Sequence, residues 1–200
     1  MKRRMTGFGA LWQLQRRSLA TKSTAPLKHP VCDAFRAIIL QQRSLLLEMT
    51  DDEYRFRCPT LQGTTGGHIR HALDHLSRSL AIRDSTIRYD IRERNTNVEV
   101  NRLDAIDAMD KLGTLATTQV DEAHLHKPVD AMFMLSGDGN EVKLQSTVER
   151  EMAFAVHHAI HHNALIKVIL TTHFPHVPLP PQFGVAPSTI HFLSTHPADA

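Results

Sequence analysis

Histidine is the residue type whose number and spacing in this sequence point most directly to chemistry. The chain has 14 histidines in 200 residues, and half of them fall in two short segments. These seven residues are His68, His71, His75, His157, His158, His161 and His162. Neutral imidazole is the commonest protein ligand for transition metals. The two segments therefore predict a site for a divalent metal ion: zinc, nickel, iron or manganese.

The first segment lies on a predicted helix and carries its three histidines on one side. At about 100° per residue, His68, His71 and His75 span about 60° of the helix surface, so each can reach the same target. This arc flanks the apolar stripe of the helix, and a solvated polar edge is the alternative interpretation. Asp74 is either a hydrogen-bond partner of a ligating histidine or a surface charge.

The second segment contains two pairs of histidines four residues apart, and the apolar pattern of its helix distinguishes them. His158 and His162 border the apolar face, whereas His157 and His161 point about 140° to 180° away from its centre. Glu151, one heptad before His158, lies on the same side of the helix. Two histidines from this helix and one from the first would leave positions open for water or substrate, as catalytic metal sites do. Packing and hydrogen bonding at a helix interface is the alternative role.

Four amphipathic segments predict the helices that position these side chains, because their apolar residues are three, four and seven apart. The helices are expected at 31–49, 67–89, 98–118 and from the cap at Ser146 or Thr147 to about 172, the second capped by Thr64 or Thr65. Residues 51–63 are expected to form a loop, and residues 128–144 a β-hairpin. The predicted fold is an all-α four-helix bundle with a short β-hairpin inserted between helices three and four.

The ends of the chain differ from this central region in composition. Six of the ten prolines lie beyond residue 174, which excludes a further long helix, so residues 175–200 are expected to form an extended tail. Residues 1–25 are rich in arginine and contain no acid, which is typical of a mitochondrial or plastid transit peptide. A disordered basic arm on a cytoplasmic protein is the alternative. The domain itself is then expected at 26–174, a length that supports one core.

Charge and hydropathy exclude several classes of function. The formal net charge of +2 arises from the first 22 residues, and the remainder has more acidic than basic residues. Nucleic-acid binding is therefore disfavoured. No apolar run reaches the roughly 18 residues of a membrane span. Cys32 and Cys58 have no metal-binding or redox spacing, so both are expected to be buried, reduced thiols.

The motifs GGHIRHALDHLSRSL and EREMAFAVHHAIHHNALIKVI resemble those of the DinB/YfiT-like superfamily of metal-binding four-helix bundles. The resemblance covers roughly residues 31–172. It implies that His71, His158 and His162 hold a divalent metal ion. The crowding of His68 and His75 beside His71 departs from the common pattern, so either neighbour could replace His71. Further ligands, or partners that orient the ligands, would come from a second group: His68, His75, Asp74, Glu151 and His161.

Two arginines between the second and third helices are candidates for substrate binding. The YDIRER segment, together with an FGVAPST segment in the tail, resembles a subgroup of DinB-like proteins. Arg92 and Arg94 could bind a substrate carboxylate or phosphate, because guanidinium groups bind such anions bidentately. Pairing with neighbouring acids is the alternative, since charged runs in loops are usually solvated.

The function expected from these residues is that of a metal-dependent enzyme that activates water or a thiol. The resemblance includes thiol-dependent transferases, so a hydrolase and a thiol transferase are both consistent with it, acting on an unspecified small molecule. The alternative is a non-catalytic bundle whose metal serves a structural, sensor or dimerisation role, with His68 or His75 closing the site as a fourth ligand. A homodimer is compatible with either function. A bundle without metal, in which the histidines pack and respond to pH, is a third hypothesis.

Overall fold

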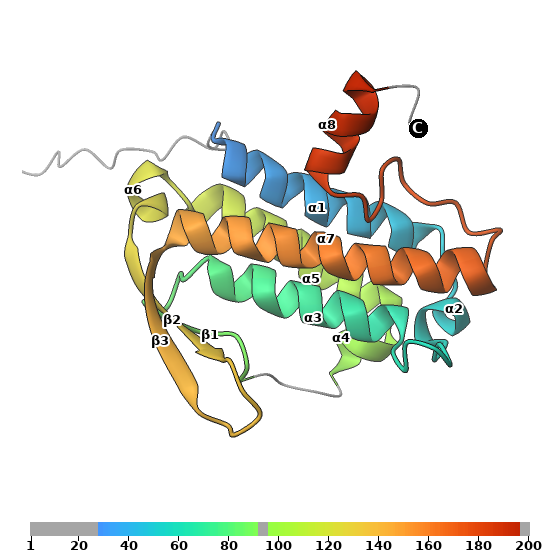
Figure 1. Cartoon of the computed structure of the whole chain (residues 1–200), viewed down its shortest axis with the longest axis horizontal. Helices are drawn as coiled ribbons and strands as arrows, with labels where there is room; N and C mark the ends of the chain where they lie inside the picture. The colour runs from blue at the N-terminus through green and yellow to red at the C-terminus, as the bar shows by residue number, and fades with distance from the viewer. Residues whose placement is uncertain (1–27, 92–95, 197–200) are drawn as a thin grey trace, which may run out of the picture.

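The structure, a computed structural model, describes residues 28–91 and 96–196. Four long helices run side by side through it (Figure 1): α1 (Pro30–Leu47), α3 (Thr65–Ser79), α5 (Arg102–Gln119) and α7 (Val148–His173). α7 packs against both α3 and α1, and α5 packs against α1 and α3. The described chain is mostly helical, as predicted, and its two histidine-rich segments lie on the neighbouring helices α3 and α7.

Shorter elements connect the long helices. They are α2 (Asp51–Arg55), α4 (Asn97–Val100), α6 (Glu122–Leu125), α8 (Pro187–Thr195), β1 (Thr86–Arg88), β2 (Pro128–Met134) and β3 (Glu141–Thr147). β2 pairs with β3 in antiparallel register and with β1 in parallel register. The resulting three-stranded sheet lies at one end of the long helices (Figure 1). The sheet contains the hairpin that the sequence predicts between α5 and α7.

Side-chain caps determine where the two histidine-bearing helices begin. The Thr64 hydroxyl accepts a hydrogen bond from the Gly67 N–H at 2.8 Å, as one of the two predicted caps of α3. At α7 the cap is Thr147, which accepts from the Arg150 N–H at 3.3 Å. The alternative cap, Ser146, is wrong, because its hydroxyl donates instead to Glu151.

The apolar faces of the four long helices bury one core. Aromatic and aliphatic side chains from every long helix contribute to it, and fully buried examples are Phe35, Leu45, Leu46, Ile69, Leu76, Met109 and Met152. Gly66 allows the backbone of α4 to approach the start of α3, since a Cβ there would lie 2.1 Å from the Glu99 carbonyl oxygen. Both cysteines are buried and free, in agreement with the sequence.

The second predicted helix extends ten residues too far, to residue 89 instead of Ser79. α3 ends at Ser79, and the chain turns at Ala81, whose φ of 45° lies in the left-handed region. Residues 86–88 then pair with β2, and Ile87 and Tyr89 are buried. The apolar residues of 82–89 fit a helix and a strand equally well over so short a run, and the tertiary pairing with β2 decides between them.

The third predicted helix is interrupted. Asn101 ends α4 and caps α5, because its side-chain oxygen accepts from the N–H groups of Leu103 and Asp104. Two leucines with the helical spacing of the apolar residues in this segment are nevertheless exposed: Leu103 at 60% and Leu115 at 39%.

Two segments predicted to be irregular contain helices. Residues 51–63 include α2, which a capping box between Thr50 and Glu53 stabilises. The tail is not wholly extended, since residues 187–195 form α8, with Pro187 in its first turn where proline is tolerated. The predicted leader at 1–25 lies outside the described residues. Within residues 28–91 and 96–196, no helix combines the length and apolarity needed to cross a membrane.

Candidate metal centre

The imidazoles of α3 and α7 meet where these two helices pack together. The Nε2 atom of His158 lies 2.9 Å from Nε2 of His71 and 3.2 Å from Nε2 of His162. Two helices with side chains three or four residues apart bring these groups to one place, because such residues project from the same face. The histidines that bordered the apolar face of α7 in the sequence therefore lie beside those of α3.

The rings of His71, His158 and His162 are close together and steeply inclined to one another. Their centroids are 4.9, 4.7 and 4.6 Å apart in pairs, and their planes make angles of 69°, 68° and 79°. Imidazole lone pairs lie in the ring plane, so three ligands of one ion at about 2.1 Å have centroids roughly 4.5 to 5.2 Å apart. The three rings have the separation that a shared ion requires.

His75 belongs to the same cluster but has a different orientation. Its ring lies between the rings of Tyr89 and His158, stacked on Tyr89 at 4.7 Å and 12° and on His158 at 4.0 Å and 27°. Ligand atoms of His71, His75 and His158 all lie within 4.8 Å of one another, which makes these residues a second candidate set. We favour the set with His162, because the lone pairs of two stacked rings lie in separate, nearly parallel planes and so do not converge on one ion.

The remaining histidines of the two segments surround this cluster. His68 approaches His162 from the other side, with the two Nδ1 atoms 3.0 Å apart. His161 is exposed, and its ring centroid lies 5.4 Å from that of His162. His157 is also exposed. The exposure of His157 and His161 agrees with the apolar pattern of the sequence, which places both on the outer side of α7.

The two acidic residues singled out in the sequence have different surroundings. Asp74 is half-buried and forms an ion pair with Arg70 at 2.9 Å. Glu151 is fully buried, and its carboxylate accepts from Tyr89 at 2.8 Å and from Ser146 and Arg150 at 2.7 Å each. Glu151 thus holds the Tyr89 ring against His75, and within residues 28–91 and 96–196 no histidine is among its hydrogen-bond or ion-pair partners.

The aromatic side chains beside the cluster were missed by the sequence reasoning. Tyr89, Phe133 and Phe154 contact one another with centroids 5.2 to 5.6 Å apart, and Phe154 also lies 5.9 Å from His158. They come from the loop after β1, from β2 and from α7. The pairing of β1 with β2 brings these three rings together. The spacing of residues within a single helix does not predict such a pairing.

Burial keeps the innermost histidines neutral at physiological pH. Desolvation, with further contributions from His71, His158, His68 and His161, lowers the pKa of His162 to about 2. Burial, followed by the charge of His161, also lowers the pKa of His68. A neutral imidazole is the form that binds a metal ion, so His162 can bind a cation without first losing a proton.

Polar contacts behind the cluster fix α7 against α1 and the tail. The fully buried Asn163, next to His162, accepts from Gln42 at 2.8 Å and donates to Gln41 at 3.2 Å. Gln41 in turn donates to the carbonyl of Pro181. Gly184 packs so closely on α7 that a Cβ would lie 2.7 Å from the Ala164 backbone. The FGVAPST segment therefore positions the helix that carries the site.

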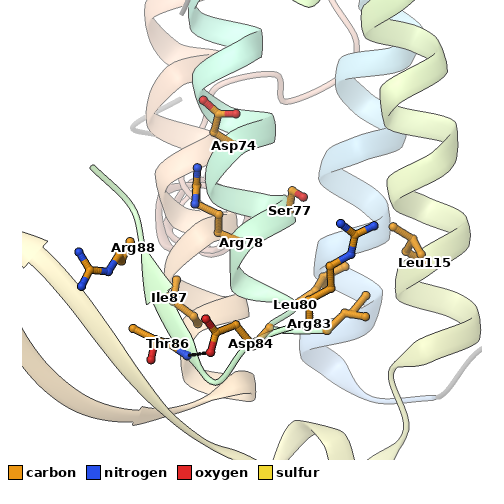
Figure 2. A pocket seen from close by; sticks show the side chains of 12 residues that line it. Asp74, Ser77, Arg78, Leu80, Arg83, Asp84, Thr86, Ile87, Arg88 and Leu115 are labelled. Atoms are coloured by element: carbon orange, nitrogen blue, oxygen red, sulfur yellow. Dashed lines mark hydrogen bonds between the residues drawn. The ribbon is translucent and has the colours of Figure 1, made fainter. Parts of the chain in front are cut away.

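A cavity of about 510 Å³ opens beside α3 and the loop that leads to β1. Figure 2 shows three arginines at its edge, with Arg88 directed away from Arg83 and Arg78 reaching up towards Asp74. Arg88 forms an ion pair with Glu141, and Arg78 donates to the carbonyl of Ile91. Because the guanidinium groups do not converge, the cavity has no built anion site. The predicted substrate-binding residues, Arg92 and Arg94, lie outside the described part of the chain.

Comparison with known proteins supports the fold. The structure is similar to the crystal structure of a DinB-like protein, YjoA, from Bacillus subtilis, with a TM-score of 0.53 and 14% sequence identity. The match covers 79% of this chain and 100% of that chain. No family model and no curated protein matches the sequence. The chain thus has a DinB-like fold, and its histidine cluster is compatible with binding a metal ion.

Proposed function

We propose that the protein binds one divalent metal ion through His71, His158 and His162 and uses it to activate water or a thiol. In this proposal the four long helices form the bundle of DinB-like proteins, and the metal site lies between α3 and α7. The observation that carries it is the mutual tilt and spacing of the three rings. Zinc, nickel, iron and manganese are the candidates; imidazole ligands suit the first three, whereas manganese prefers oxygen ligands.

The cluster fits a metal ion in donor type as well as in geometry. The Nε2 atoms of His71 and His162 both lie within hydrogen-bond distance of Nε2 of His158. Each neutral ring carries a single proton, so these three atoms cannot all be paired by hydrogen bonds among themselves. A shared cation satisfies all three lone pairs at once. The fully buried Glu151 is not assigned as a further ligand, because its carboxylate already accepts hydrogen bonds from Tyr89, Ser146 and Arg150.

Three protein ligands leave coordination positions for a reactant. A divalent ion with such positions lowers the pKa of a water or thiol bound to it and so supplies a nucleophile near neutral pH. His71 and His158 are only half-buried, so a small molecule can approach from their side. The aromatic rings of Tyr89, Phe133 and Phe154 would then form an apolar wall beside it.

A structural metal site is the second candidate, and the position of His75 favours it. With His75 as a fourth ligand the ion would be closed off from substrate, as in structural zinc sites. His75 meets the distance requirement with His71 and His158. Its stacking on Tyr89 would have to be lost for its lone pair to turn towards the ion.

The test is the metal content of protein purified without a histidine tag and dialysed against Zn²⁺. We expect about one zinc per chain in the wild type and in His157→Ala, an exposed histidine of the same helix that serves as the control. His71→Ala and His158→Ala should each lose most of it. Stoichiometric zinc in both of these variants would refute the ligand assignment.

The same proposal includes an organelle for the protein. We propose that residues 1–25 direct import into mitochondria and are then removed, with a cytoplasmic location as the alternative. Amino-terminal sequencing of the protein isolated from its own cells tests this. A mature chain that begins near residue 25 supports import, and an intact Met1 contradicts it.

A further inference from the structure

The nitrogens of His162 both lie close to other imidazoles. Nε2 lies 3.2 Å from Nε2 of His158, and Nδ1 lies 3.0 Å from Nδ1 of His68. The two nitrogens of an imidazole point in divergent directions, so His68 and His158 lie on different sides of the His162 ring. A metal ion bound at Nε2 of His162 would therefore lie on the side away from His68.

The hydrogen bond on the far nitrogen determines what Nε2 can do. A neutral imidazole carries its proton on one nitrogen only, and the nitrogen without it is the one that binds metal. For Nε2 of His162 to be a ligand, the proton must be on Nδ1, where the acceptor within reach is Nδ1 of His68.

We propose that His68 is a positioning residue: its Nδ1 accepts the Nδ1–H of His162 in the metal-loaded protein and so orients the His162 ring with Nε2 towards the ion. This inference rests on the proposed function. Partners of this kind fix the tautomer of a ligating histidine and raise its affinity for the metal. The sequence alone left His68 as either a ligand or such a partner.

The other nitrogen of His68 argues against a ligand role for this residue. Its Nε2 is buried, has no hydrogen-bond partner in the described chain and faces Gly63. A Cβ at Gly63 would lie 3.0 Å from this atom. If Nδ1 of His68 accepts a hydrogen bond, its proton is on Nε2, and the glycine at position 63 leaves space for it. His68 thus has one nitrogen against His162 and the other against the loop before α3, and neither is directed to the point shared by the three ligands.

Two substitutions at position 68 separate the acceptor role from simple packing. Asparagine carries its side-chain oxygen about where histidine carries Nδ1, so His68→Asn keeps an acceptor for His162. His68→Leu fills similar space without one. The affinity of the full-length, metal-free chain for Zn²⁺ would be measured by competition with a chromophoric chelator, and thermal unfolding would show that both variants fold.

We expect His68→Leu to bind Zn²⁺ about 10- to 100-fold more weakly than the wild type and His68→Asn to stay within about threefold. In the zinc-loaded wild type, nitrogen-15 NMR should show the His162 proton on Nδ1 and protected from exchange, and in His68→Leu this protection should be lost. Equal affinity of His68→Leu and the wild type would overturn the inference, while leaving the proposed metal site intact. Equal large losses in both variants would instead make His68 a ligand and would also overturn it.

A wild-type chain that binds no Zn²⁺ is a different result. It refutes the proposed function and the role of His68 together. The two failures are distinguishable, because the first concerns the variants only and the second already appears in the wild type. If His68→Leu does not fold, the exchange protection of the His162 proton in the zinc-loaded wild type decides the question alone.

Discussion

Removing the hydroxyl of Tyr89 should destabilise the protein more than removing that of Tyr54. Both rings are almost completely buried, so Tyr→Phe deletes one oxygen in each case without a change in packing. The Tyr54 hydroxyl donates to a neutral acceptor, the carbonyl of Val98, at 2.7 Å. The Tyr89 hydroxyl donates to the carboxylate of the fully buried Glu151 at 2.8 Å.

The charge of the acceptor sets the expected difference. A hydrogen bond to a neutral group contributes about 0.5 to 1.5 kcal/mol, whereas one to a charged group contributes about 1.5 to 3 kcal/mol. Ser146 and Arg150 both bind Oε1 of Glu151, so the loss of Tyr89 leaves Oε2 without a donor in the described chain. We expect Tyr89→Phe to cost about 2 to 3 kcal/mol and Tyr54→Phe about 1 kcal/mol.

The assay is urea unfolding of the metal-free chain, followed by circular dichroism. The two variants should have the slope of the wild type, so that the shift in midpoint reports stability alone. A cost for Tyr89→Phe that is equal to or smaller than that for Tyr54→Phe would refute the reasoning, since Glu151 would then not depend on Tyr89 for its stability.

Further predictions concern pH, the core and two glycines. Burial, followed by the charge of Glu151, raises the pKa of Tyr89, so above about pH 10 the unfolded chain loses a proton that the folded chain keeps, and stability should fall with rising pH. Tyr89→Phe should show a shallower decline of the unfolding free energy between about pH 10 and 11. Leu76→Ala, at a side chain with 0% exposure, should cost about 2 to 5 kcal/mol in urea unfolding, against less than about 0.5 kcal/mol for Leu40→Ala, which is 60% exposed; similar costs would contradict the assigned core. Gly66→Ala should lower the thermal midpoint, because its Cβ would meet the α4 backbone at 2.1 Å, whereas Gly113→Ala, with open space in the middle of α5, should raise stability by about 0.5 to 1 kcal/mol. A stabilised Gly66→Ala would show that α4 does not pack there.

Local patterns predicted those parts of the fold whose cause is local. The spacing of apolar residues located the long helices, and threonine caps at positions 64 and 147 gave the starts of the two that carry the site. The chain after Ser79 could not be predicted in this way. Its conversion into β1 depends on pairing with β2, more than 40 residues away, and short apolar runs do not distinguish helix from strand.

For the candidate site, too, only the features that depend on a single helix could be predicted from the sequence. The apolar pattern of the sequence selected His158 and His162, because the buried face of α7 depends on the spacing of residues within one helix. The choice among His68, His71 and His75 depends on the orientation of rings from two different helices. The spacing of residues in the sequence does not determine that orientation. The resemblance to DinB-like proteins supplied His71 for that position. Tyr89 was assigned to a helix, so its contact with His75 and Glu151 was beyond the reach of the sequence argument.

The central claim is that one ion is shared by three imidazoles, and an anomalous difference map from crystals of the zinc-loaded chain tests it most directly. The account predicts a single strong peak about 2.1 Å from the Nε2 atoms of His71, His158 and His162, with His75 still stacked on Tyr89. A map without a peak between α3 and α7, or with a peak bound by His75 in place of His162, would contradict it.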